Sequence, residues 1–179
     1  MSAPVPVAKS PHVSFERERG VYAVDVTRDV AHAVVSIEDD DLRSSRINHV
    51  FQVLANADIP IFLIKMHRAA VAFALAGGHL ARAEAELAEH GASPVVRRDL
   101  AIVTVRAASM RELHTVIVDI TDSLYDANAR LYEMGDSHNS VQCLIETHRV
   151  DAAVEALCKT FDLETDAVRH MSVGSGGTA

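Results

Sequence analysis

The chain has 179 residues, of which 49% are hydrophobic and only 4% aromatic, with a formal net charge of −8. This length allows one ordinary domain or two small ones with an aliphatic core. Lysine occurs only at positions 9, 65 and 159, so no basic stripe is available for nucleic acid, which we exclude as a partner. No apolar run approaches the ~18 residues of a membrane span. We therefore expect a cytoplasmic protein without membrane contact.

The first part of the chain predicts a tail, a hairpin and a helix. Residues 1–19 combine prolines with small residues and are expected to be a disordered tail. Two alternating apolar segments, 21–25 and 31–37, flank the turn-forming residues 27–29 and predict a β-hairpin. After an acidic break, Ser44 or Ser45 is expected to cap a helix. Its apolar face carries Ile47, Val50, Phe51 and Leu54 at spacings of three and four.

The next segments predict two strands, a helix and a short strand. Residues 61–65 and 70–76 are expected to pair as antiparallel strands around a turn at 66–68. Gly77 and Gly78 end the second strand, and a helix follows with Leu80, Ala83 and Leu87 facing inward. Gly91 stops this helix, and residues 94–96 form a short closing strand. The order is therefore β-α-β-β-α-β.

The same order repeats 70 residues later without a gap. The segment 47–87 aligns with 117–157, so that Leu54 falls on Leu124 and Leu87 on Leu157. The second copy predicts strands at 100–105, 130–134, 141–146 and 167–173. Its helices begin after Thr115 and at Val150, the latter running to Phe161.

This pattern indicates an α+β protein made of two ferredoxin-like βαββαβ modules in tandem. Each module would form a four-stranded antiparallel sheet with two helices on one face. We expect the first module at residues 20–97, the second at 98–173, and a disordered tail at 174–179. The other face of each sheet must be buried by a further element or a second chain.

Several segments resemble the tandem ACT domains that form the regulatory part of aspartate kinases. They include VFQVLANADIPIFLIK at 50–65, VAFAL at 71–75 and, most specifically, AVEALCKTFDL at 153–163. The likeness spans about residues 21–174 and is greatest for the small-subunit form, which contains only the ACT pair. The resemblance implies a non-catalytic, allosteric module that binds a small ligand, usually an amino acid, in a homodimer. It also implies a biosynthetic enzyme as partner, and no kinase domain is present.

The loops before the first helix of each copy depart from the family pattern. Family members carry a D-x-P-G turn there, whereas residues 41–44 read DLRS and residues 112–115 read ELHT. The family's asparagine at the start of the second strand is replaced by Pro60 and Arg130. These effector loops are therefore degenerate, and we expect the two modules to bind a ligand unequally.

The loops still offer polar groups at helix starts, where an ammonium group or an anion can be held. Candidate ligand-binding residues lie in these loops and in the hairpin turns expected nearby in a neighbouring copy. They are Asp40, Asp41, Arg43, Ser44, Ser45 and His67 for the first module, and Arg111, His114, Thr115, Ser137 and His138 for the second. A solvated acidic loop and exposed turn residues without a role are the alternative interpretation.

Two other functions stay open. The scaffold would act as a small biosynthetic enzyme if His114 or His138 served as general base, or as a structural dimerisation unit without a ligand. The ten histidines show no helical i, i+4 pair with a third ligand nearby, so we expect no metal and no cofactor. Cys143 and Cys158 lack ligand spacing and are expected to be reduced core residues.

Overall fold

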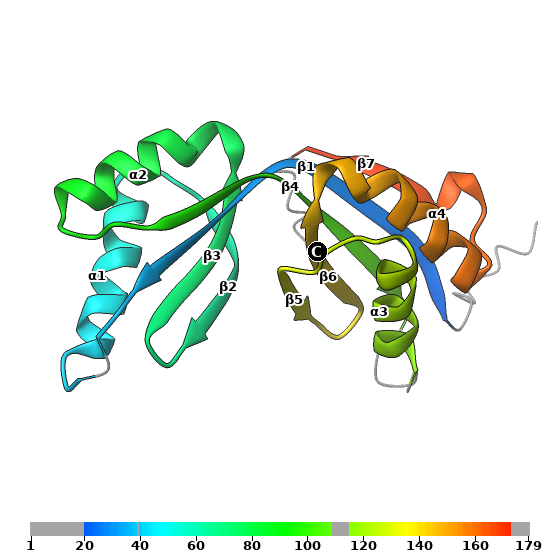
Figure 1. The fold of residues 1–179 in the computed structure, drawn as a ribbon, viewed down its shortest axis with the longest axis horizontal. Coiled ribbons are helices and arrows are strands. Elements are labelled where there is room, and N and C mark those ends of the chain that lie inside the picture. Colours follow the sequence, from blue (N-terminus) through cyan, green and yellow to red (C-terminus); the bar gives the residue numbers. More distant parts are fainter. Residues whose placement is uncertain (1–19, 39, 109–114, 173–179) are drawn as a thin grey trace, which may run out of the picture.

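The computed structural model describes residues 20–38, 40–108 and 115–172. Figure 1 shows two lobes joined by two long strands that cross between them. The elements follow in the order β1 (Val21–Ser36), α1 (Arg43–Asn56), β2 (Ile61–His67), β3 (Ala70–Ala76), α2 (Leu80–Glu89), β4 (Val95–Ala107), α3 (Val116–Asp126), β5 (Glu133–Asp136), β6 (Ser140–Glu146), α4 (Val150–Phe161) and β7 (Val168–Met171). None of the described helices is long and apolar enough to cross a membrane.

The structure differs from the sequence-based expectation at both ends of the first module, where it has two long strands. Residues 21–37 do not form a hairpin, because β1 runs without reversal from Val21 to Ser36. Asp29 has a positive φ of 57°, and the β1–β4 register shifts between Thr27 and Val30. The expected turn residues therefore make a β-bulge inside a strand. Likewise, β4 is one strand from Val95 to Ala107 rather than two short ones.

Each lobe takes one half of each long strand. The first lobe has the strand order β2-β3-β1-β4, using the second half of β1 and the first half of β4. The second lobe uses the other halves, and β7 pairs in parallel with residues 24–27 of β1. The first half of β1 is thus an additional strand of the second lobe. The expected module boundary at residues 97 and 98 falls inside β4, and residues 21–27 lie outside the first lobe, where we had expected them.

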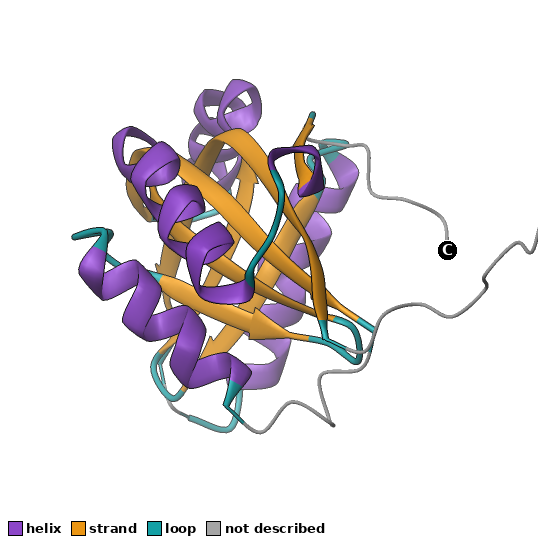
Figure 2. Cartoon of the chain, turned by 90° about the vertical axis from the view of Figure 1, so that its right-hand side faces the viewer, coloured by secondary structure: helices purple, strands orange, loops and turns teal. Residues whose placement is uncertain are grey.

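A hydrophobic core lies between sheet and helices in each lobe, and a third apolar cluster lies between the sheets. The first-lobe core includes Phe73, Leu54 and Leu87, and the second includes Leu124 and Leu157, all at most 1% exposed. The third cluster contains Val30, Ala74, Leu100, Ile102 and Leu144, with Phe62, Leu63 and Tyr132 packed against it. The helices lie on the outside of both lobes (Figures 1 and 2). The open sheet faces therefore cover each other.

The backbone repeats with the 70-residue period seen in the sequence. Strands β3 and β6 have identical bounds in this register, 70–76 and 140–146. Asp29 and Asp99 have φ values of 57° and 58°, and Asp58 and Asn128 have φ values of 52° and 50°. The first pair bends the two long strands at equivalent positions, and the second pair follows α1 and α3. The expected α+β class, with antiparallel sheets and helices on one face, is confirmed.

Candidate functional site

The loop before α1 and the β2–β3 turn lie side by side within one lobe. Nε of Arg43 donates a hydrogen bond to the carbonyl of Arg68 at 3.0 Å, and Nη2 donates to the carbonyl of His67 at 2.7 Å. The sequence predicted that these two groups would meet across neighbouring copies. In the structure they meet within one chain, and the guanidinium of Arg43 braces the turn.

The acidic residues of the same loop are held by internal contacts. The carboxylate of Asp40 accepts a hydrogen bond from the backbone N–H of Leu42 and pairs with Arg46 at 3.0 Å. Because α1 begins at Arg43, Ser44 and Ser45 fall in its first turn and do not cap it. The capping prediction is therefore wrong. Asp41, Ser44 and Ser45 are exposed, so their polar groups are accessible to a ligand.

In the second lobe, the predicted residues are only partly described. Arg111 and His114 lie outside the described residues. Thr115 precedes α3, and its hydroxyl donates to Asp119 at 2.9 Å rather than to a backbone N–H. His138 is exposed in the β5–β6 turn.

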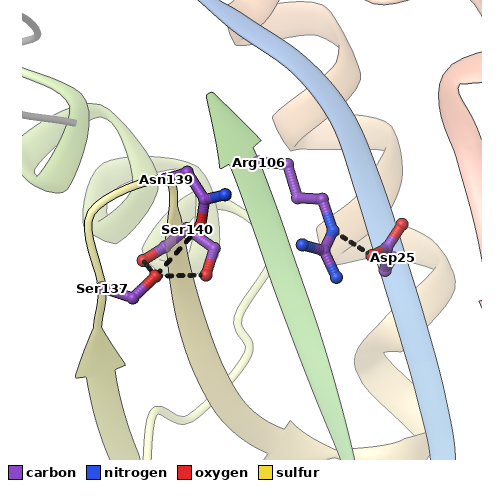
Figure 3. A network of polar contacts seen from close by, with 5 residues as sticks. All are labelled: Asp25, Arg106, Ser137, Asn139 and Ser140. Atoms are coloured by element: carbon purple, nitrogen blue, oxygen red, sulfur yellow. Dashed lines mark hydrogen bonds and ion pairs between the residues drawn. The ribbon is translucent and has the colours of Figure 1, made fainter. Parts of the chain in front are cut away.

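Ser137, in the same turn, belongs to a hydroxyl network. Its Oγ lies 2.8 Å from Oγ of Ser140 and 3.3 Å from the Asn139 side-chain oxygen (Figure 3). The turn is therefore fixed by its own hydroxyl groups.

On the neighbouring strands, Nε of Arg106 donates to the carboxylate of Asp25, which is 4% exposed.

Glu133 on β5 lies between two histidines of the first lobe. Its Oε1 is 3.6 Å from Nε2 of His32 and 3.8 Å from Nε2 of His67. His32 is 5% exposed, and its Nε2 has no hydrogen-bond partner within the described part of the chain. Both distances exceed those of hydrogen bonds, so the contacts are electrostatic and depend on histidine protonation. The sequence predicted a role for His67 but none for His32 or Glu133.

Cationic and aromatic side chains extend this contact between the lobes. The guanidinium carbons of Arg97 and Arg130 lie 5.0 and 5.1 Å from the ring centre of Tyr132. The Tyr132 hydroxyl and the Arg130 backbone N–H donate to the carboxylate of Glu146. Burial raises the pKa of Glu146, but these hydrogen bonds, its own backbone N–H and His148 outweigh burial and hold the pKa below its ordinary range. Glu146 therefore stays charged.

The pKa of His32 is lowered, chiefly because burial disfavours its charged form. Glu133 raises the pKa, whereas Arg97 and His67 lower it further. The unfolded chain thus binds more protons than the folded chain at pH values between the folded pKa of His32 and its ordinary value of 6.5. The stabilisation present above that value is lost as the pH falls.

We therefore expect the midpoint of thermal unfolding to decrease between about pH 7 and pH 5. A His32→Gln variant should show a smaller decrease over the same range, as measured by circular dichroism. His138→Gln, which removes an exposed histidine, serves as the control and should keep the wild-type pH dependence. Equal pH dependence in all three proteins would contradict the role of His32.

The cysteines and acidic clusters offer little reactive chemistry. Cys143 and Cys158 are free, and burial raises the pKa of Cys143 to about 12 and that of Cys158 in the same direction. These thiols are therefore poor nucleophiles. Among the residues that the structure describes, no group of three His, Cys, Asp or Glu side chains could hold a metal ion.

The structure thus consists of two α+β lobes that share their central strands, β1 and β4. The chain has the fold of aspartate kinase regulatory subunits. It superimposes on the regulatory subunit from Thermus thermophilus with a TM-score of 0.71 and 20% identity, over 79% of this chain and 97% of that chain. Against the structure of aspartokinase alpha and beta subunits, the TM-score is 0.74 with 20% identity, covering 80% and 100%.

The chain is also similar in sequence to a curated aspartokinase. The chain is 26% identical over 114 residues to Aspartokinase 1 of Bacillus subtilis (strain 168), which corresponds to 64% of this chain. The match spans 28% of the length of that protein. No protein-family model matches the chain.

Proposed function

We propose that the chain is a non-catalytic regulatory ACT pair of the aspartate kinase type. It would bind a small ligand, most simply an amino acid, and transmit binding to a biosynthetic enzyme. The observation that carries this proposal is the extent of the structural match. Nearly every part of the T. thermophilus regulatory subunit, 97% of it, has a counterpart in this chain.

The shared strands supply a physical route for regulation. Because β1 and β4 each enter both sheets, a ligand that tilts one lobe also moves strands of the other. The seam formed by Glu133, His32 and His67 lies where such a movement would change distances. A ligand that binds one lobe arrangement better than another shifts the population toward it.

We propose ligand contacts at the two degenerate loops, with unequal affinities. The first loop presents Asp41, Ser44 and Ser45 at the start of α1, and the second presents Thr115 near the start of α3. Arg43 joins the first loop to the β2–β3 turn, whereas its counterpart in the 70-residue register is Leu113, whose side chain cannot form hydrogen bonds. We therefore expect different ligand preferences at the two loops.

The proposal includes a homodimer. Helix α3 exposes Ile117, Val118 and Tyr125 by 47, 56 and 81%, whereas the counterparts of the last two residues on α1 are Asn48 and Ala55. Grouped exposed apolar side chains of this kind are typical of association surfaces. We expect a second copy to cover α3, and a monomer at micromolar concentration in sedimentation equilibrium would contradict this.

We further propose a catalytic aspartate kinase subunit of the same organism as the partner enzyme. In the structure of aspartokinase alpha and beta subunits, a chain of this fold is matched over its whole length. An amino acid that controls the kinase would then act through the present chain. The partner proposal depends on the regulatory function and would fall with it.

A thermal-shift panel of the common L-amino acids tests the regulatory function. A ligand that binds only the folded state, present at about ten times its Kd, should raise the unfolding midpoint by about 3–6 °C. The D-enantiomer of the responding amino acid is the control and should have little effect. A folded protein that responds to no member of the panel would contradict the proposal.

A further inference from the structure

A polar cleft lies between the lobes, and none of the described residues in the loops before α1 and α3 lines it. Its volume is about 380 Å³, within the range of small-molecule sites. The first lobe contributes three consecutive β2 residues, and the second contributes the end of β5, the following turn and β6. The lining residues are Leu63, Ile64, Lys65, Gly135, Asp136, Ser137, Ser140 and Gln142. A molecule in this cleft would contact both lobes at once.

A strained bulge in β2 forms part of the cleft wall that the first lobe contributes. The β2–β3 register passes from Phe62 directly to Lys65, which leaves Leu63 and Ile64 without a paired residue. Leu63 has a φ of +50°, and it is the one residue other than Gly, Asp or Asn with positive φ in the described ranges. Leucine rarely adopts this conformation, and such strain is concentrated at functional sites. The bulge leaves Leu63 and Ile64, which both line the cleft, out of the ladder.

The corresponding strand of the second lobe shows that the bulge is not a property of the repeat. Residues 133–136 of β5 pair with β6 in continuous register. The counterpart of Lys65 in the repeat is Gly135, and this glycine faces the bulge. A Cβ added at Gly135 would lie 2.6 Å from Cδ1 of Leu63, so the bulge and the glycine are fitted to each other.

The cleft carries one positive and one negative side chain. Lys65 and Asp136 are its charged residues, and within the described part of the chain neither forms an ion pair. Arg106 projects near Ser140 in the β4–β6 register, but its guanidinium is bound to the buried carboxylate of Asp25 (Figure 3). The amino group of Lys65 is therefore the cation left to bind a ligand.

Hydroxyl and amide groups line the second-lobe wall. Ser140 is 8% exposed and lies in hydrogen-bond distance of Ser137, while Gln142 is partly buried. Such groups can accept and donate hydrogen bonds to a polar ligand. Lys65 and Asp136 together carry no net charge. With the polar wall of the second lobe, they complement a small zwitterion rather than an anion, a cation or an apolar molecule.

We infer that this cleft is a binding site for a free α-amino acid, with the carboxylate on Lys65, the ammonium group on Asp136 and the side chain toward Ser137 and Gln142. The inference rests on the proposed regulatory function and adds a site between the lobes. Bound there, the amino acid joins β2 to β5 and holds the lobes at one spacing. Ligand binding is thereby converted into a lobe arrangement that a partner can sense.

Titration calorimetry of the full chain with the amino acid that gives the largest thermal shift tests the site. Lys65→Ala and Asp136→Asn should each raise the Kd about tenfold or more, because each removes a charge-assisted contact. Lys159→Ala on α4 and Asp122→Asn on α3 remove matched charges from exposed positions and should change the Kd less than about twofold. Circular dichroism should show that all four variants fold.

The possible results distinguish failure of the inferred cleft site from failure of the proposed regulatory function. Wild-type affinity in both cleft variants would overturn the inference and leave the regulatory function standing. A wild-type chain that responds to no amino acid would overturn the function as well. Loss of binding in the cleft variants, with binding retained in both controls, supports the site.

Discussion

Replacing Arg106 with leucine is expected to lower the free energy of unfolding by about 3 kcal/mol. The guanidinium binds the carboxylate of Asp25, whose side chain is 5% exposed, while that of Arg106 is 35% exposed. Within the described residues, the second carboxylate oxygen, Oδ1, is buried without a hydrogen-bond partner. Removal of Arg106 leaves this charge with no compensation in a poorly solvated position. Chemical denaturation monitored by circular dichroism measures the change.

Two further variants test whether the loss of stability comes from the buried charge of Asp25. Replacing Asp25 and Arg106 together with leucine should recover much of the lost stability, because no buried charge remains. Arg98→Leu breaks a pair with Glu84 of 2.7 Å on the surface, where the side chains are 58% and 34% exposed. This control should destabilise by less than about 1 kcal/mol. Equal effects of Arg106→Leu and Arg98→Leu would contradict the importance of burial.

The elements with strong local patterns were predicted correctly. Strand 70–76 and helix 150–161 match their expected bounds, because apolar spacing and the flanking glycines or charged residues define each element locally. The paired positive φ values of Asp29 and Asp99 also follow the 70-residue register, but this pair lies outside the aligned segments 47–87 and 117–157 and was not predicted. Local chemistry was sufficient wherever one lobe alone determines the conformation.

The long strands could not be predicted because a bulge and a turn use the same residues. Asp29 adopts positive φ in either case. The choice depends on pairing with β4 and β7, whose paired residues lie 61 to 86 and 144 positions further along the chain, respectively. The same long-range pairing places the first half of β1 in the second lobe. No periodicity within residues 21–37 carries that information.

The seam between the lobes was missed for a similar reason. His32 alternates with Ala31 and Ala33, which belong to the first-lobe core, so the alternation of strand side chains puts it on the sheet face opposite the helices. That face was expected to be covered, but by an unidentified element. Its approach to Glu133, 101 positions away, depends on how the lobes face each other. A buried histidine on an open sheet face was the available signal.

The cleft was not predicted either, because residues of both lobes line it. Lys65 is one of three lysines in the chain, and no motif around it distinguishes it from the other two. Its significance comes from a bulge that the repeat does not predict and from a second-lobe turn at Ser137. The loops before α1 and α3 attracted the sequence-based predictions because family patterns mark them. The inferred site lies where the equivalent strands β2 and β5 of the two copies differ in backbone geometry.

Replacing Leu144 with alanine is expected to lower the free energy of unfolding by about 2–5 kcal/mol and to destabilise both lobes together. Leu144 on β6 is 0% exposed and packs between the sheets with Leu100 and Ile102. Removing its side chain leaves a cavity in the cluster that both lobes share. Because β1 and β4 each belong to both sheets, neither sheet can unfold alone without breaking strands of the other.

Hydrogen exchange measured by mass spectrometry distinguishes joint from separate unfolding. In Leu144→Ala, the slowest amides of β3 in the first lobe and of β6 in the second should lose protection to the same degree, as expected when both exchange through global unfolding. Leu42→Ala, at a position 60% exposed, is the control and should change stability by less than about 0.5 kcal/mol. If β6 lost protection while β3 kept it, the lobes would be independent units, and the shared strands could not transmit a binding signal between them.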